Sequence, residues 1–419
     1  MPNRSFLSKK ESVAPGCKLS KNRMVLPLGR NLADNDPGNP KALQKLYQEI
    51  NDAHTDKLKK SSSEMLEGTL SVYAFIVIFP LAVIGGLIFL IRNFIRSTEY
   101  CDADARFDGK TIVVTGGSSG LGRTLSVELA KRGARVIVAC RTKARRDSTA
   151  YFLRSKTGSF NIRTMFMDLT SLDSVYDFCQ ELVDTEDRID AVVNNAAILC
   201  PQDKTSDELD IMLGVNYIGH FLLTNLLCSK LLQHGTSNSP ARIVNVVCSS
   251  LRSGHIVRLD DMEGKTDGSY NMRTVYRSSK LALHLMTKEL AHKYVEEGVV
   301  SYSTDPGYVN TGLYKHLEGP FGKFNQTCAK ALYRTTEEGI QTILYCLSSK
   351  DVLKQSGSLF KDCRICDARN SEWTEKSIKE LWDRTSELIL SKGIKLELGA
   401  TDEDEEAEKA DSEVADSEQ

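Results

Sequence analysis

The feature that most constrains the fold is a glycine-rich turn between a β-branched run and an amphipathic helix. Glycines at positions 116, 117, 120 and 122 directly follow the apolar segment Thr111–Thr115, and a helical pattern covers Leu121–Arg132. Such glycines allow a tight turn and let the backbone approach a phosphate at a helix N-terminus, which attracts anions. A glycine turn alone is a weak signal, but this setting predicts a dinucleotide-binding unit.

Strand-like and helix-like segments alternate from residue 107 to about residue 395. Six short apolar runs are predicted to be buried strands: Thr111–Thr115, Arg135–Cys140, Ile162–Met167, Ala191–Asn195, Arg242–Val247 and Val299–Ser303. Longer amphipathic stretches, such as Ser171–Val183 and Ser278–Val295, lie between them. The alternation predicts an α/β fold in one domain, a doubly wound parallel sheet with helices on both faces.

A long uncharged segment precedes this domain. No charged side chain occurs from Gly68 to Ile91, which is long enough to cross a hydrocarbon core of about 30 Å as a helix. It begins too late for a cleaved signal peptide, and a buried core helix is the alternative. We therefore predict a single transmembrane helix over residues 69–92. Basic residues on both sides leave its orientation undecided.

The two ends of the chain differ from the domain in composition. Residues 1–68 are polar and are predicted to be disordered, although Lys41–Lys60 carries a short helical pattern. Residues 396–419 are predicted to be a solvated acidic tail. A net charge of −2 gives no reason to expect nucleic-acid binding, and eleven scattered cysteines suit a reducing compartment. The lone pair Cys363 and Cys366 lacks further ligands, so we predict no metal site.

The residues after the second predicted strand bear on cofactor choice. Enzymes that prefer NAD place a carboxylate there for the ribose 2′-hydroxyl. This chain instead has Arg141, followed by Lys143, Arg145 and Arg146. Because a guanidinium pairs with a 2′-phosphate, the sequence favours NADP(H) over NAD(H). The alternative is that these cations only solvate the start of a helix.

A tyrosine and a lysine four residues apart open a later helix. Tyr276 and Lys280 would project from one helix face. A free tyrosine titrates near pH 10, and a nearby ammonium group favours its ionised form. An isolated pair of this kind is usually chance, but this one follows a dinucleotide-binding turn. The combination indicates hydride transfer between a nicotinamide cofactor and an alcohol or carbonyl compound.

Five ordered motifs carry a family resemblance: Thr115–Gly122, Asp168-Leu169, Asn194–Ala197, Tyr276 with Lys280, and Asp305–Gly307. Over about residues 107–370 the chain resembles the short-chain dehydrogenase/reductase superfamily. Leu213–Thr224 and Ala139–Arg141 are typical of its retinol dehydrogenase group. Val309–His316 is similar to a membrane-associated, X-linked branch of vertebrates. The resemblance implies a single-pass protein of the endoplasmic reticulum membrane.

The resemblance also implies roles for individual residues. Asp168 would bind the adenine with Leu169 beside it, Asn195 and Ala196 would line the adenine ribose, and Lys280 would hold the nicotinamide ribose. Asn216 would hold a water in a proton relay. Other cofactor-binding positions would be Gly116, Ser118, Ser119, Gly120, Leu121 and Gly122 at the turn and Pro306, Gly307, Val309 and Thr311 at the nicotinamide end. Ala197 departs from the family, which usually has glycine there.

The family also has a serine that hydrogen-bonds the substrate oxygen, and here the pattern is disturbed. Counting from Asn245 puts Cys248 in that position, whereas counting back from Asp260 favours Ser249; Ser250 remains an alternative. A thiol is a weaker hydrogen-bond donor than a hydroxyl group. We assume a one-residue insertion and assign Ser249.

Two functions follow as hypotheses. The first is a membrane-anchored, NADP(H)-dependent oxidoreductase acting on a small lipophilic alcohol, aldehyde or ketone of the retinoid, steroid or polyprenol class. The second is a non-catalytic nucleotide-binding scaffold or sensor on the same fold, because fold does not fix function. A homo-oligomer is compatible with either hypothesis.

Overall fold

The computed structural model describes residues 40–96, 100–101, 105–265, 270–313, 332–369 and 373–398. The chain divides into two compact units, Met1–Gly85 and Gly86–Gln419. The predicted acidic tail beyond Leu398 and residues 1–39 lie outside the described residues.

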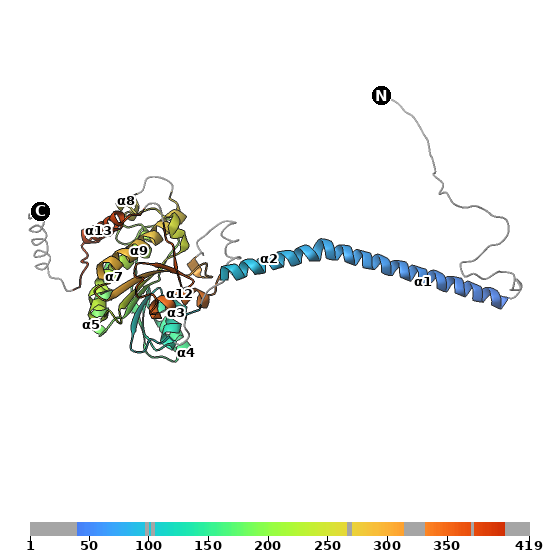
Figure 1. The fold of residues 1–419 in the computed structure, drawn as a ribbon, viewed down its shortest axis with the longest axis horizontal. Coiled ribbons are helices and arrows are strands. Elements are labelled where there is room, and N and C mark those ends of the chain that lie inside the picture. Colours follow the sequence, from blue (N-terminus) through green and yellow to red (C-terminus); the bar gives the residue numbers. More distant parts are fainter. Residues whose placement is uncertain are drawn as a thin grey trace, which may run out of the picture. The chain divides into compact units, whose positions relative to one another are not determined.

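A long helix occupies the described part of the first unit. Helix α1 (Pro40–Tyr73) leads through the π-helical turn η2 (Ala74–Ile78) into α2 (Phe79–Arg96), which crosses the boundary between the units (Figure 1). The π turn directly precedes Pro80, whose ring and missing N–H are incompatible with regular α-helix hydrogen bonding. Residues 40–68 are thus helical, which agrees with the helical pattern of Lys41–Lys60 and differs from the disorder predicted for the remaining residues.

Two helices of the described chain are long and apolar enough to cross a membrane. In the helical stretch Gln44–Phe94, the most apolar part is not buried at all. The stretch Ile211–His234, in contrast, is mostly buried and belongs to the domain core. The predicted apolar segment is therefore helical and has its side chains exposed. Such a helix could span a bilayer, because lipid replaces water around it.

The second unit contains an eight-stranded sheet in the order β3-β2-β1-β4-β5-β6-β7-β8. All neighbouring strands pair in parallel except β7 and β8, which form an antiparallel hairpin. The strands are β1 (Thr111–Thr115), β2 (Arg135–Cys140), β3 (Ile162–Phe166), β4 (Ala191–Asn194), β5 (Ala241–Val246), β6 (Val299–Asp305), β7 (Leu359–Lys361) and β8 (Arg364–Cys366). This confirms the predicted doubly wound sheet, to which the structure adds the last two strands.

Helices cover both faces of the sheet, each with its own hydrophobic core (Figure 1). One face carries α5 (Leu172–Thr185), α7 (Gly219–His234), α9 (Met272–Tyr294) and α13 (Glu375–Ser391). The other carries α3 (Gly120–Lys131), α4 (Lys143–Thr157) and α12 (Gln341–Ser348). Shorter elements are α6 (Ile211–Leu213), η3 (Gly214–Ile218), η4 (Ser249–Ser253), α8 (Leu259–Met262) and α11 (Thr336–Gly339).

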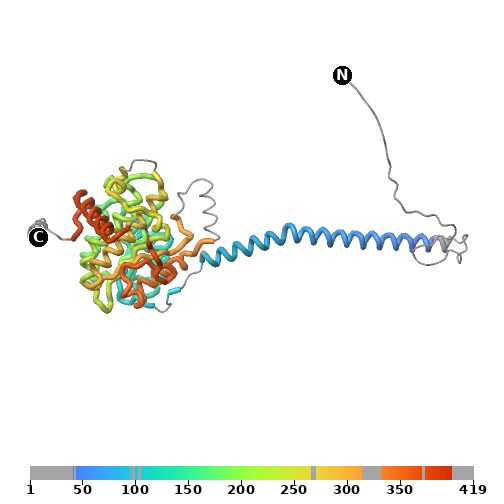
Figure 2. Tube along the Cα trace, turned by 45° about the horizontal axis from the view of Figure 1, so that its top comes forward, coloured from blue at the N-terminus to red at the C-terminus, as the bar shows by residue number. Residues whose placement is uncertain are grey.

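Helix α13, red in Figure 2, covers α7 and α9. The ring of Trp382 packs edge-on against Phe221 at 4.6 Å, and the buried hydroxyl groups of Tyr217 and Thr385 are 2.9 Å apart. Helix α13 therefore covers the outer side of α7 and α9.

The end of α2 and the residues after it are bonded to the domain within the second unit. The Arg96 guanidinium forms a two-pronged ion pair with Glu338 of α11, with a shortest distance of 2.7 Å. Farther along, the backbone N–H of Cys101 donates to Gln341 Oε1 at 3.0 Å. These bonds fix the start of the folded domain to α11 and α12.

Candidate active site

The strand order places the candidate site. Strand β1 pairs with β2 on one side and with β4 on the other, so the direction of winding reverses between β1 and β4. Ligands of open α/β sheets bind in the crevice outside the carboxyl ends of the strands at such a reversal. The glycine turn begins there, directly after Thr115.

The glycine turn has no room for side chains at its key positions. A Cβ atom on Gly116 would lie 2.9 Å from Ala196 Cα, and one on Gly122 would lie 2.5 Å from Asn195 Nδ2. Gly116 and Gly120 also have positive φ angles of 65° and 54°, which other residues rarely adopt. Ser119 caps α3 without using its side chain, so the first N–H groups of α3 remain for an anion. The turn thus fits a dinucleotide pyrophosphate.

Thr115 links this turn to the catalytic side. Its hydroxyl oxygen accepts the backbone N–H groups of Asn195 and Ala196, each at 2.9 Å, and lies 2.9 Å from His220 Nε2. Burial lowers the pKa of His220 to about 3, so the imidazole is neutral. We assign the hydroxyl proton to Nε2, which leaves Nδ1–H to face the Asn216 carbonyl at 3.4 Å. The sequence interpretation missed His220, although it lies inside a quoted segment.

The predicted adenine-end residues lie at the ends of β2 and β3. Arg141 is exposed directly after β2, and the Thr142 hydroxyl caps α4. One carboxylate oxygen of Asp168 accepts the N–H and the hydroxyl group of Thr170, at 3.0 and 2.9 Å. Leu169 is buried against Gly219, where a Cβ atom would lie 2.9 Å from its side chain.

The predicted nicotinamide-end residues follow β6. Gly307 has a φ of 76°, and a Cβ atom there would lie 2.9 Å from Arg334 Nη1; the Pro306 carbonyl accepts from the same guanidinium at 3.3 Å. Val309 is buried, and Thr311 lies 3.5 Å from the position of a Cβ atom on Gly120. The loop after β6 therefore meets the glycine turn. Residues 314–331, which follow this loop, lie outside the described chain.

Helix α9 carries the predicted proton-transfer pair. Lys280 is buried, its ammonium group donates to the Val246 carbonyl at 2.8 Å, and it lies 6.0 Å from the ring centre of Tyr276. Burial lowers the pKa of Lys280 to about 8. The structure thus brings the end of β5 and the start of α9 to the same crevice.

Asn216 lies in η3, a π-helical turn beside α9. Its side chain both accepts from Ile198 N at 2.8 Å and donates to Ile198 O at 3.0 Å, and its amide group also donates to Ser279 Oγ at 3.1 Å. Turns of this kind inside helices frequently mark functional sites. The side chain is used to fasten η3 to the loop after β4, next to the helix that carries Tyr276.

The turn after β5 separates its three candidate residues. Cys248 Sγ lies 2.8 Å from Ser250 Oγ, whereas Ser249 donates its hydroxyl hydrogen to the Asp305 carboxylate. Lys361 Nζ is 3.2 Å from Ser249 Oγ. The predicted catalytic hydroxyl is therefore already engaged with residues at the ends of β6 and β7.

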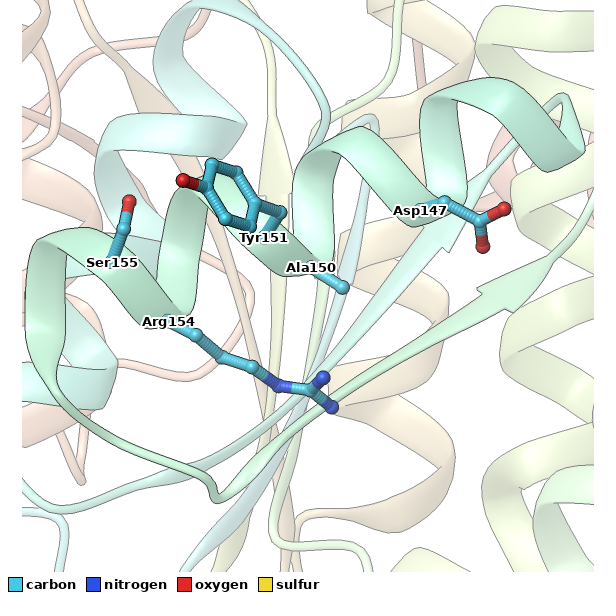
Figure 3. Close-up of a pocket in the computed structure, with 5 residues that line it drawn as sticks. All are labelled: Asp147, Ala150, Tyr151, Arg154 and Ser155. Atoms are coloured by element: carbon cyan, nitrogen blue, oxygen red, sulfur yellow. The ribbon is translucent and has the colours of Figure 1, made fainter.

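A shallow hollow on the surface is separate from this crevice. Figure 3 shows its lining residues, Asp147, Ala150, Tyr151, Arg154 and Ser155, all on α4. None of the residues assigned to cofactor binding or proton transfer lines it.

Comparisons with known proteins agree with a dinucleotide-binding site at this crevice. The family model described as short chain dehydrogenase matches residues 110–319. Human retinol dehydrogenase 14 is 38% identical over 300 residues, which cover 67% of this chain and 86% of that relative. Human retinol dehydrogenase 13 is 31% identical over 320 residues, which cover 74% of this chain and 95% of the relative.

A solved structure shares the fold. An uncharacterized protein from Mycobacterium paratuberculosis superposes with a TM-score of 0.55 at 26% sequence identity, covering 70% of this chain and 97% of that one. The resemblance of Val309–His316 to an X-linked branch stays a prediction.

Proposed function

Because the chain belongs to the short-chain dehydrogenase family, where its relatives include retinol dehydrogenases, we propose that it is a membrane-anchored, NADP(H)-dependent oxidoreductase. It would interconvert a lipophilic alcohol and its aldehyde or ketone. The proposed substrate classes are retinoids, steroids and polyprenols, and the proposed location is the endoplasmic reticulum membrane.

One observation carries the proposal: Tyr276 and Lys280 lie four residues apart on α9, and the Lys280 ammonium group bonds the Val246 carbonyl at the end of β5. The ammonium group of Lys280 is buried 6.0 Å from the tyrosine ring. Asn216 is fastened beside the same helix through Ser279. A proton-transfer group next to a dinucleotide cradle suits alcohol–carbonyl chemistry.

In the direction of reduction, the bound nicotinamide would supply a hydride to the carbonyl carbon. The Tyr276 hydroxyl would donate its proton to the carbonyl oxygen, so that one C–H and one O–H bond form. Lys280 would stabilise the resulting phenolate through its positive charge. The Asn216 region would hold the water through which Tyr276 regains a proton. The reverse sequence oxidises the alcohol.

The preference for NADP(H) is supported by charge. The end of β2 carries Arg141 and has no carboxylate, and α4 begins with further cations at Lys143 and Arg145. A ribose 2′-phosphate placed there would meet positive charge, whereas a carboxylate would repel it.

The substrate class is supported by the apolar helix. A helix held in lipid keeps the attached domain close to molecules dissolved in the same lipid, which raises their effective concentration. The relatives named retinol dehydrogenase point to the same class of compound.

The test is a turnover assay with full-length protein in detergent, NADPH and a panel of lipophilic aldehydes that includes all-trans-retinal. We expect NADPH consumption matched by alcohol formation. NADPH binding without turnover of any aldehyde or of the corresponding alcohols with NADP⁺ would favour the scaffold hypothesis, which the disturbed serine pattern keeps open.

A further inference from the structure

The turn after β5 contains a second network that the proposed chemistry does not use. Ser249 donates to one carboxylate oxygen of Asp305, and the other oxygen accepts Gly307 N–H at 2.9 Å. Lys361 Nζ lies 3.6 Å from the Asp305 carboxylate. Ser249 therefore connects β5 to the loop that begins at Asp305 and carries Gly307.

Cys248 points to a different set of partners. Its thiol contacts Ser250 Oγ at 2.8 Å, and the residue is partly buried. The Lys280 ammonium group bonds the carbonyl of Val246, two residues earlier in the same strand end. Burial raises the pKa of the Cys248 thiol, while the hydrogen bond with Ser250 and the charge of Lys280 act in the opposite direction.

Ser250 belongs to the helical turn η4. This turn ends at Gly254, where a Cβ atom would lie 2.6 Å from the backbone oxygen of Arg277, in the residue directly after Tyr276. The N–H group of His255 then donates to Ser278 Oγ at 3.0 Å. The segment that starts with Cys248 thus runs along the first turns of α9.

We propose that the pair Cys248 and Ser250 polarises the substrate carbonyl and that Ser249 is a positioning residue for the loop Asp305–Gly307. The chain would then run in register with Asn245, without an inserted residue. A thiol replaces the usual hydroxyl group, and Ser250 is its hydrogen-bonding partner.

These separate roles of Cys248 and Ser249 have a chemical consequence. Thiols are weak hydrogen-bond donors, so a hydroxyl group in the same place should stabilise the developing negative charge on oxygen better. Replacing Cys248 by serine should therefore raise turnover. Removing the Ser249 hydroxyl should instead loosen the loop at Gly307 and weaken cofactor binding. The proposal rests on the proposed oxidoreductase function.

The experiment compares kcat and the NADPH Kd of four variants. Cys248→Ala should lower kcat about tenfold or more, and Cys248→Ser should raise kcat severalfold above the unmutated protein. Ser249→Ala should weaken NADPH binding by about tenfold, the usual loss for one hydrogen bond to a charged group, and should lower kcat less than Cys248→Ala does. Ser249→Thr keeps the hydroxyl group and should restore the Kd.

Alkylation of Cys248 gives a readout that needs no turnover. Peptide mass spectrometry after iodoacetamide treatment should show slower labelling of Cys248 when NADPH is bound. Cys366, the matched control, is also partly exposed but bonds Arg252, so its labelling should not change.

Opposite results would overturn the proposal. In that case, Ser249→Ala would lower kcat by about 10²-fold without changing the NADPH Kd, and neither Cys248 variant would change kcat. If no aldehyde is turned over, the proposed function fails, but the Kd of the Ser249 variants and the labelling of Cys248 still decide the register.

Discussion

The two halves of the sheet build their parts of the crevice from different material. At the end of β1 the site consists mainly of backbone, with Gly116 and Gly122 packed so closely that a methyl group would collide with neighbours. At the end of β5 it consists of side chains, and Cys248 and Ser249 point to different partners. A site made of backbone requires glycine at the positions where a side chain would collide. A site made of side chains changes its chemistry when the turn shifts by one residue along the sequence.

The difference affects how each half should respond to mutation. In the cofactor half, substitutions act through steric fit and charge at the edge of the crevice. In the catalytic half, removing a proton-transfer or carbonyl-polarising group should change the chemical step while cofactor binding persists, whereas the positioning residue Ser249 should act on cofactor binding. The following predictions separate these two kinds of response.

The largest effect is expected for Tyr276→Phe. The ring keeps its packing but loses the proton donor, so kcat should fall by about 10² to 10⁴. The NADPH Kd, measured by fluorescence titration, should stay within about twofold of the unmutated value. The substitution removes only the Tyr276 hydroxyl group, whose contribution to cofactor binding should be less than one full hydrogen bond. Near-normal kcat in this variant would remove Tyr276 from the mechanism and with it the distinction between the halves.

Arg141→Asp tests a side chain in the half that is built mainly of backbone. The ratio of kcat/KM for NADPH to that for NADH should fall by about 10- to 100-fold, because a charge-assisted pair is replaced by repulsion. Lys143→Ala is the matched control for a general loss of positive charge and should have a smaller effect. Equal use of both cofactors by the unmutated protein would refute the assigned role of Arg141.

The pH profile probes the buried lysine. Lys280 has a pKa lowered to about 8, so its positive charge is present below that pH and is lost as the pH rises through it. For carbonyl reduction, kcat/KM should therefore decline above about pH 8. Lys280→Arg keeps its charge at high pH and should move the decline upward. A profile that is the same for both proteins would assign the decline to another group.

The smallest effect on catalysis is expected for removal of the apolar helix. A protein that begins at residue 93 keeps the Arg96–Glu338 ion pair and the bond from Cys101 to Gln341. It should be soluble and bind NADPH within about twofold of the full chain, because the helix supplies no group to the crevice. A protein that begins at residue 105 loses both contacts and should melt roughly 2 °C lower.

Membrane attachment is checked on the full-length chain. After alkaline carbonate extraction it should remain in the pellet, since a spanning helix resists this treatment. Full-length protein in the supernatant would contradict the transmembrane assignment.

The sequence predicted best those parts of the fold that are buried. The six long strands are β-branched runs buried in a parallel sheet, so their limits were predicted to within one or two residues. Strands β7 and β8 have three residues each and a mixed composition, which gives no recognisable period. Residues 61–68 of helix α1 were not predicted to be helical because their pattern is polar and only weakly amphipathic.

The candidate site divides in the same way. Glycine positions and the spacing of Tyr276 and Lys280 are properties of the sequence itself, so they could be recognised without the structure. The register of a turn such as Cys248–Ser250 is set by tertiary contacts with Asp305 and Lys361, which no local pattern encodes. The bond from Thr115 to His220 joins elements 105 residues apart and could not be inferred from spacing.

We propose that this crevice transfers a hydride from NADPH and a proton from Tyr276 to one lipophilic carbonyl group. The direct measurement uses NADPH deuterated at the transferable position of the nicotinamide, all-trans-retinal and mass spectrometry of the product. We expect an alcohol with one deuterium on the former carbonyl carbon, formed by the unmutated protein and at least about 10²-fold more slowly by Tyr276→Phe. Bound NADPH with no deuterium in any alcohol across the aldehyde panel, or equal transfer by both proteins, would contradict it.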